Sequence, residues 1–233
     1  MVDINFKALF PTPFGFVNFG EDARELNQML VKNIDEEMTK YQPETEERTF
    51  TKNEFGWQSK FGLENHYSSF EKLAGAISSC IAPIVAESGY GVEYSQKLKA
   101  SGFWANVIFG RGGFSDPHVH GSGNVLWSGV YYPKSDHSDL DDFNADDFMV
   151  GGGNYAGNGY LVLRDPATVT KKLIRTGNLK HDKYYGGAIS VIPRESLLLL
   201  FPVWLEHFVL PVTDDKKRYS ISFAIAKPKE EGE

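Results

Sequence analysis

The sequence has a single cysteine, no surplus of basic residues and no long apolar segment. Cys80 cannot form an internal disulfide, and its apolar surroundings indicate a buried helical position rather than a reactive thiol. Asp and Glu total 31 against 24 Lys and Arg, a net charge of −7. This charge disfavours nucleic acid as a partner, because phosphate binding needs a basic surface.

Signals for membrane insertion and export are also absent from the sequence. No window reaches the roughly 18 apolar residues that a membrane span requires, and no basic segment precedes an apolar one near the first residue. We therefore expect no membrane partner and a cytoplasmic location. The oligomeric state is left open, with a homodimer as one alternative.

Aromatic residues and glycine are abundant instead. Aromatics make up 14% of the chain, with 17 Phe and 11 Tyr, beside 23 Gly, and this mixture favours strands and tight turns over helical bundles. A length of 233 residues suits one β-rich domain.

Two helices are predicted in the first hundred residues. Glu21–Lys40 has an apolar residue at every fourth position, and a second stripe of this kind runs from Phe70 to Ile84. Ser68 and Ser69 are the candidate N-caps of the second helix, and Pro83 is expected to kink it late. Both stripes are expected to face the core.

After Gly102, short β-branched and aromatic segments alternate with turns, which predicts a sandwich or barrel. Pro193–Glu195 is expected to form the turn of a hairpin. Asp136–Asn158 is rich in Asp, Gly and Asn, and is expected to be an exposed loop that could act as a lid. The predicted strands are Phe103–Phe109, Asn124–Tyr132, Tyr160–Leu163, Ala188–Ile192, Ser196–Phe201, His207–Leu210 and Tyr219–Ala226.

Three of the six histidines are spaced as metal ligands would be. His118 and His120 are two residues apart, so in an extended segment both imidazoles point the same way, and His207 lies in a later strand-like segment. Three protein ligands leave positions open on a metal ion for O2 and a chelating substrate. Asp116 is an alternative ligand, because it precedes His118 by the same spacing.

The other histidines, His66, His137 and His181, lie in loops or beside helices and are expected to be structural or exposed. Arg218 and Ser220 are predicted to share one face of an alternating strand. A guanidinium beside a hydroxyl suits the distal carboxylate of a dicarboxylic acid. Trp127 and Tyr131 could also line the pocket, although core packing is favoured for either residue alone.

Five blocks of the sequence, in order, resemble a family of 2-oxoglutarate- and Fe(II)-dependent oxygenases with the signature HxH…SGVYY…LLFPxWLxH…RxSxSF. The resemblance covers about residues 103–224, with 134–158 as an insertion. The wider superfamily, which includes prolyl hydroxylases, has HxD or HxE where this chain has His118 and His120. The blocks are Phe103–Val107, Pro117–His120, Trp127–Tyr132, Leu199–His207 and Arg218–Phe223.

The resemblance implies a mainly β fold with flanking helices, the double-stranded β-helix, or jelly roll, of the cupin-like proteins. It implies Fe(II) held by His118, His120 and His207, and 2-oxoglutarate held by Arg218 and Ser220, with Tyr131 as a further cosubstrate contact. We expect residues 101–227 to form this oxygenase core and residues 1–100 to pack on it, within a single domain.

The implied activity is hydroxylation of a small-molecule or peptide substrate. Two alternatives remain at this point. One is a cupin-like dioxygenase with a three-histidine iron site and no 2-oxoglutarate, and the other is a non-catalytic jelly-roll binding module. The orientation of Arg218 relative to the histidines discriminates between the two enzymes.

Overall fold

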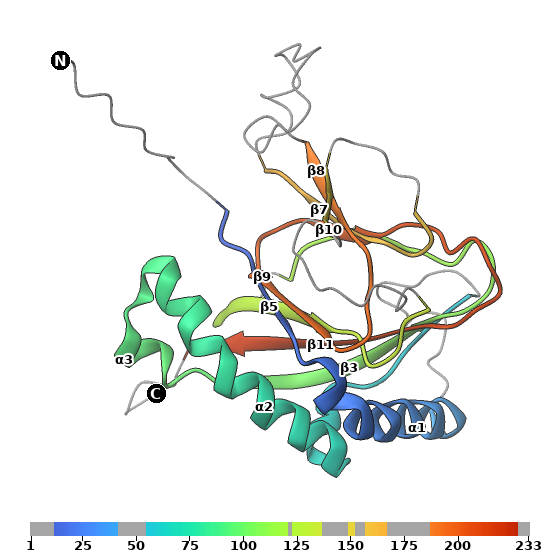
Figure 1. The fold of residues 1–233 in the computed structure, drawn as a ribbon, viewed down its shortest axis with the longest axis horizontal. Coiled ribbons are helices and arrows are strands. Elements are labelled where there is room, and N and C mark those ends of the chain that lie inside the picture. Colours follow the sequence, from blue (N-terminus) through green and yellow to red (C-terminus); the bar gives the residue numbers. More distant parts are fainter. Residues whose placement is uncertain are drawn as a thin grey trace.

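The computed structural model describes residues 12–41, 55–120, 123–136, 149–151, 157–166 and 187–227. These residues form two antiparallel sheets, with helices α1 and α2 on the far side of the larger sheet from strands β7, β8 and β10 (Figure 1).

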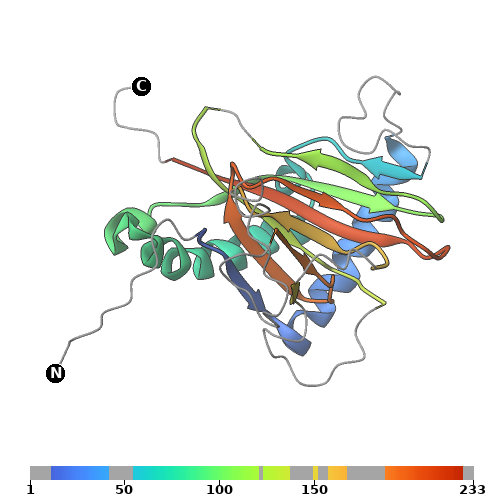
Figure 2. The same ribbon diagram turned by 90° about the horizontal axis from the view of Figure 1, so that it is seen from above.

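The larger sheet has six strands in the order β1-β9-β5-β11-β3-β2. The long strands β3 and β11 run side by side in its middle (Figure 2). Its strands are β1 (Gly15–Asn18), β2 (Gly56–Gln58), β3 (Ala100–Ile108), β5 (Val125–Tyr131), β9 (Leu197–Pro202) and β11 (Arg218–Ala226).

The smaller sheet has five strands in the order β4-β10-β7-β8-β6. They are β4 (Ser115–His118), β6 (Met149–Gly151), β7 (Leu161–Arg164), β8 (Ala188–Val191) and β10 (His207–Val209). From β3 onward the chain passes repeatedly from one sheet to the other, which is the topology of the predicted double-stranded β-helix.

Successive side chains of each long strand point to opposite sides, so the larger sheet has two different faces. In β11, Ile221 and Phe223 belong to the core on the helix side, whereas Ser220 and Ser222 line the pocket between the sheets. The same alternation in β3 places Phe103 on the helix side and Trp104 on the pocket side. The functional site and the main core therefore lie on opposite faces of one sheet.

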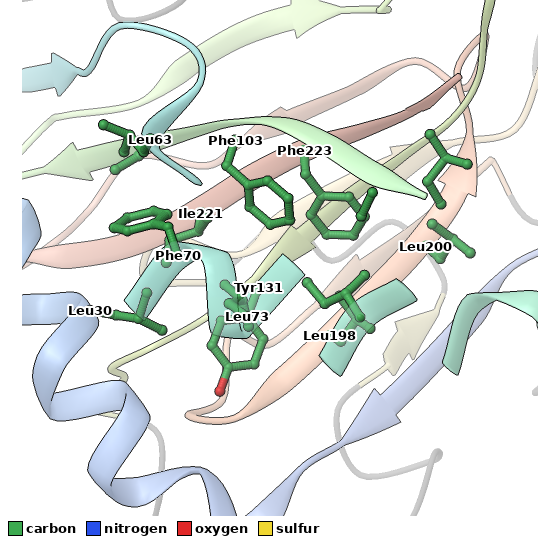
Figure 3. Close-up of a cluster of buried hydrophobic side chains, with 14 of the residues drawn as sticks. Leu30, Leu63, Phe70, Leu73, Phe103, Tyr131, Leu198, Leu200, Ile221 and Phe223 are labelled. Atoms are coloured by element: carbon green, nitrogen blue, oxygen red, sulfur yellow. The ribbon is translucent and has the colours of Figure 1, made fainter. Parts of the chain in front are cut away.

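Helices α1 (Arg24–Lys40) and α2 (Ser68–Val85) cover the helix side of this sheet. Figure 3 shows Leu30 of α1 and Phe70 and Leu73 of α2 among side chains of the sheet. The shorter helices are η1 (Gly20–Ala23), η2 (Leu63–Asn65), η3 (Ala86–Tyr90) and α3 (Val92–Ser95).

The prediction of a serine N-cap on α2 is wrong. The N-cap is Tyr67 and makes no side-chain cap hydrogen bond. The Ser69 hydroxyl instead donates to Asn33 Oδ1 of α1 at 2.6 Å, so it joins the two helices. Cys80 is half-buried on α2, and burial raises the pKa of its thiol.

The predicted hairpin at Pro193–Glu195 is also wrong. The strands on either side, β8 and β9, belong to different sheets. Ser196, just before β9, has a φ of 67°, a left-handed conformation that residues other than glycine rarely adopt. A local turn signal marks a change of direction, but the partner of each strand depends on contacts distant in sequence.

Within its described residues, the predicted loop Asp136–Asn158 contains strand β6. Residues 137–148 and 152–156 of the loop lie outside the described residues, and so do His137 and His181. Its described ends, Asp136 and Asn158, do not line the pocket with the histidines but a second hollow beside Arg218. The role of this loop as a lid stays a prediction.

The segment Ser68–Gly89 is long and apolar enough to cross a membrane by length and composition alone. A core helix passes the same test, and the side chains of Phe70, Ile77 and Ile81 are fully buried against the sheet. The apolar face of α2 thus has a partner within the molecule.

Candidate active site

The three predicted histidine ligands come together at one end of the smaller sheet. His118 ends β4 and His207 begins β10, and these two residues are direct Cα partners in the antiparallel pair. His120 lies two residues beyond β4, where its backbone N–H donates to the Val203 carbonyl at 3.1 Å. Strand pairing thus joins parts of the chain that are far apart in sequence.

One ring nitrogen from each of the three histidines lies within 4.8 Å of the corresponding nitrogens of the other two. The ring centroids of His118 and His207 are 4.3 Å apart, and the rings of His120 and His207 are nearly parallel, at 6°. The Nε2 atoms of His120 and His207 are 3.0 Å apart. This distance fits two ligands at about 90° around one ion, because metal–nitrogen bonds of about 2.1 Å place such ligands roughly 3 Å apart.

Backbone carbonyls orient two of the rings. The Nδ1 of His118 is 2.7 Å from the Asp116 carbonyl oxygen, and the Nδ1 of His207 is 2.9 Å from the Leu205 carbonyl oxygen. With Nδ1 as donor, each ring turns an unprotonated Nε2 toward the others, which is the tautomer that a metal ligand needs.

Burial keeps the histidines neutral. It lowers the pKa of His120 to about 4 and that of His207 to about 3, with the neighbouring His118 adding to both effects. Burial also lowers the pKa of His118, although Asp116 and Glu206 oppose this effect. Neutral imidazoles bind a divalent metal without first losing a proton, so the residues present fit an iron ion.

The alternative ligand, the Asp116 carboxylate, is not part of this group among the described residues. Asp116 is exposed, and it acts on the site through its backbone carbonyl, which holds His118. The remaining described histidine, His66, is exposed in a turn, as expected.

Arg218 and Ser220 line the same pocket as the three histidines. The guanidinium donates from Nε to the Gly159 carbonyl at 2.8 Å and from Nη1 to Ser220 Oγ at 3.0 Å. Its Nη2 donates to the Tyr132 hydroxyl at 3.3 Å. All three acceptors are uncharged, and within the described part of the chain no carboxylate forms an ion pair with Arg218.

Tyr131 does not lie in this pocket, so its assignment to the cosubstrate is corrected. Its side chain is on the helix side of β5, where its hydroxyl donates to Asn27 Oδ1 of α1 at 2.6 Å (Figure 3). Burial raises the pKa of this hydroxyl to about 12. Trp127 shares that core face, which agrees with the alternative of core packing for both residues.

Tyr132, the next residue, takes the place expected of Tyr131. It is fully buried beside Arg218, whose Cζ lies 5.2 Å from the centroid of the Tyr132 ring. The alternation of β5 contained a signal for this, because Ser128 and Val130 line the pocket and Tyr132 follows them at the same spacing.

Comparison with known proteins agrees with the geometry. Residues 102–224 match a family of proteins described as "Putative 2OG-Fe(II) oxygenase". This match spans more than half of the 233 residues, and the chain belongs to that family. A search of curated proteins found no match.

Solved structures with the same fold include several prolyl hydroxylases. One is a Pseudomonas putida prolyl-4-hydroxylase, with a TM-score of 0.55 at 11% identity over 92% of this chain and 93% of the other. Another is the Trichoplax adhaerens prolyl hydroxylase in complex with a hypoxia-inducible-factor peptide fragment. Its TM-score is 0.54 at 15% identity, over 93% of this chain and 84% of the other. A third is the viral collagen prolyl hydroxylase of Paramecium bursaria Chlorella virus-1, with a TM-score of 0.52 at 10% identity over 93% of this chain and 97% of the other.

The fold and the family therefore define an oxidoreductase of the non-haem iron class. The protein is a 2-oxoglutarate-dependent oxygenase, and its cofactors are Fe(II) and 2-oxoglutarate.

Proposed function

We propose that His118, His120 and His207 hold the iron, that Arg218 and Ser220 hold the distal carboxylate of 2-oxoglutarate, and that the enzyme is a hydroxylase. One observation carries this proposal: a guanidinium with only uncharged acceptors in the described residues lies in the same pocket as three converging imidazoles. A metal and a dicarboxylate can therefore occupy one cavity.

The environment of Arg218 suits a carboxylate ligand. A charge kept from water is costly unless it is paired, and the acceptors present supply no opposite charge. The Ser220 hydroxyl is buried beside the guanidinium, so a carboxylate bound here would contact both groups. The neutral three-histidine set adds no negative charge to the pocket, which further favours an anionic cosubstrate.

Iron with 2-oxoglutarate supplies the oxidation of a C–H bond by O2, with succinate and CO2 as the other products. The chain's own residues position the reactants. The carbonyls of Asp116 and Leu205 hold two of the rings, and Arg218, which lines the same pocket, orients the dicarboxylate. Apolar side chains of Ile108, Leu161 and Val209 line this pocket and limit access of water.

We propose a small molecule or a peptide as the substrate. The structural neighbour from Trichoplax adhaerens was solved with a peptide fragment, which supports the peptide alternative. The acidic net charge of −7 supports a substrate other than nucleic acid.

The cupin-like alternative, three histidines without 2-oxoglutarate, predicts no use for Arg218 in the pocket. Anaerobic titration with Fe(II) and then 2-oxoglutarate tests the proposal through the weak visible charge-transfer band of the chelated cosubstrate. We expect the band only when both are present. Fe(II) binding that 2-oxoglutarate leaves unchanged would support the cupin-like enzyme instead.

A further inference from the structure

We propose that Phe61 and Trp104 form a substrate-binding wall next to the metal site, and that the wall receives an uncharged part of the substrate that carries an apolar ring. This inference rests on the proposed function for the position of the reacting centre. Phe61 lies outside residues 102–224, so the family match does not include it.

A row of rings leads from the surface to the histidines. The Phe61 ring is 4.9 Å from the Trp104 ring, and the Trp104 ring is 5.5 Å from that of His120, measured between centroids. Trp104 is 5% exposed and lines the pocket, whereas Phe61 is 61% exposed. A ligand ring placed against this row would bury the exposed aromatic surface while its other end faces His120.

The backbone holds Phe61 in this place. The segment after β2 continues along β3, with the N–H of Ser59 donating to the Ala105 carbonyl and that of Gly62 to the Phe103 carbonyl, each at 2.9 Å. Gly62 has a φ of 87°, which a residue with a side chain rarely adopts. Phe61 is therefore exposed on a fixed segment, as a preformed binding surface requires.

The charge of the pocket points to an uncharged substrate group. Among the described residues that line it, the only charged side chain is Arg218, which the proposed function assigns to the cosubstrate. With the two carboxylates of 2-oxoglutarate paired with the metal and with Arg218, a substrate carboxylate or ammonium entering beside His120 would lose water without gaining an opposite charge of its own. An uncharged group has no such cost.

A buried amide nearby could add a polar contact. Gln58 is 7% exposed, and its Oε1 has no hydrogen-bond partner among the described residues. Gln58 is the direct Cα partner of Asn106, which lines the pocket, so the two side chains share a face. An acceptor here favours a substrate with an N–H or O–H group next to its ring.

The test measures binding to full-length protein loaded with Zn(II), which does not change redox state, and 2-oxoglutarate. The probes are N-acetylphenylalaninamide, free phenylalanine, which has the same ring with two charges, and N-acetylalaninamide, which has no ring. We expect the first to bind most tightly in calorimetric titrations. Phe61→Ala should weaken it about three- to tenfold, the contribution of one aromatic contact, whereas Phe61→Tyr should preserve it.

Met29→Ala serves as the matched control, because Met29 is 39% exposed on α1, away from the pocket, and its loss should leave binding unchanged. The inference is overturned if the phenylalanine amide does not bind, if free phenylalanine binds as tightly, or if Phe61→Ala has no effect. Binding of 2-oxoglutarate is titrated separately in the same protein. If that fails while the selectivity for the amide persists, the cosubstrate assignment fails and the binding wall stands.

Discussion

At the scale of single residues, neighbouring side chains of one strand have different roles. Tyr131 and Tyr132 are adjacent, yet the first hydrogen-bonds to Asn27 on the helix side and the second to Arg218 on the other. Because successive side chains of a strand point to opposite faces, a shift of one residue exchanges a core position for one beside the site. Substitutions at Arg218 and Tyr131 should therefore separate cosubstrate binding from stability.

Arg218→Ala should abolish 2-oxoglutarate binding and leave metal binding nearly intact. The cosubstrate carboxylate would be buried without its partner, a loss of roughly 3–5 kcal/mol, or some hundred- to several-thousand-fold in affinity. Arg218→Lys should be intermediate, because an ammonium keeps the charge but not the bidentate geometry. Calorimetric titration of 2-oxoglutarate into Zn(II)-loaded protein measures both effects.

Tyr131→Phe is the control for this experiment. It removes the donor to the buried Asn27 Oδ1, at a cost of about 1–3 kcal/mol in stability, and should leave the affinity for 2-oxoglutarate unchanged. An Arg218→Ala variant that binds 2-oxoglutarate as tightly as the wild type would remove the cosubstrate assignment.

The metal-free protein should lose stability as the pH falls from about 6.5 toward 4. The lowered pKa values of His120, about 4, and His207, about 3, mean that the unfolded chain, with an ordinary pKa near 6.5, binds more protons in this window. In this window, each of the two histidines should lower the free energy of unfolding by about 1.4 kcal/mol per pH unit as the pH falls. Urea denaturation across this range measures the slope.

His207→Gln should reduce that slope, since glutamine does not titrate. His66→Gln, at an exposed histidine outside the site, is the matched control. Equal slopes in the wild type and in His207→Gln would show that His207 is not held neutral in the folded protein.

At the scale of elements, the close pairing of β5 and β11 depends on a glycine. Gly129 is the Cα partner of Phe223, and a Cβ at Gly129 would lie 2.1 Å from Cζ of the Phe223 ring. The ring of one strand thus occupies the space of a side chain on the next. This packing lets β5 lie close to β11 and the core while the other face of β5 lines the pocket.

Gly129→Ala should therefore lower the free energy of unfolding by about 1–3 kcal/mol, the usual cost of overpacking. Gly75→Ala is the matched control, because Gly75 lies within α2 with nothing within 4 Å of the added Cβ. It should raise stability by about 0.5–1 kcal/mol, since alanine favours the helix. Chemical denaturation of both variants checks the two opposite signs.

At the scale of the whole molecule, the first hundred residues do more than flank the core. They supply β1 and β2, the two edge strands of the larger sheet, as well as α1 and α2 over its helix side. Without them, Phe103, Ile221 and Phe223 would face water. The boundary between residues 1–100 and 101–227 therefore separates two parts of one packing unit.

A fragment of residues 101–227 should not fold by itself. The apolar face that it would expose is the main core of the protein, and uncovered surface of this kind leads to aggregation. Circular dichroism on heating should show a cooperative transition for the full chain and none for the fragment. A cooperative transition in the fragment would establish residues 101–227 as an independent domain.

The sequence predicted the features that depend on local patterns, and it missed those that depend on contacts between distant parts of the chain. Alternation and the spacing of apolar residues are local, and they located seven strands and both long helices within a few residues. The spacing of His118 and His120 and the alternation of Arg218 and Ser220 are local too, so these residues were found as candidates. The short strands β1, β2, β4 and β6 were missed, because they are strands through their pairing with β9, β3, β10 and β8, which are distant in sequence.

The sequence by itself determined which residues share a face within a strand, but not what that face meets. Only the tertiary structure paired His118 with His207, separated β8 from β9 into two sheets, and turned Tyr132 rather than Tyr131 toward Arg218. It also placed Phe61 against Trp104. Each of these depends on contacts between distant parts of the chain, and the direction in which a face points is set by burial of the whole sheet between helices and a second sheet.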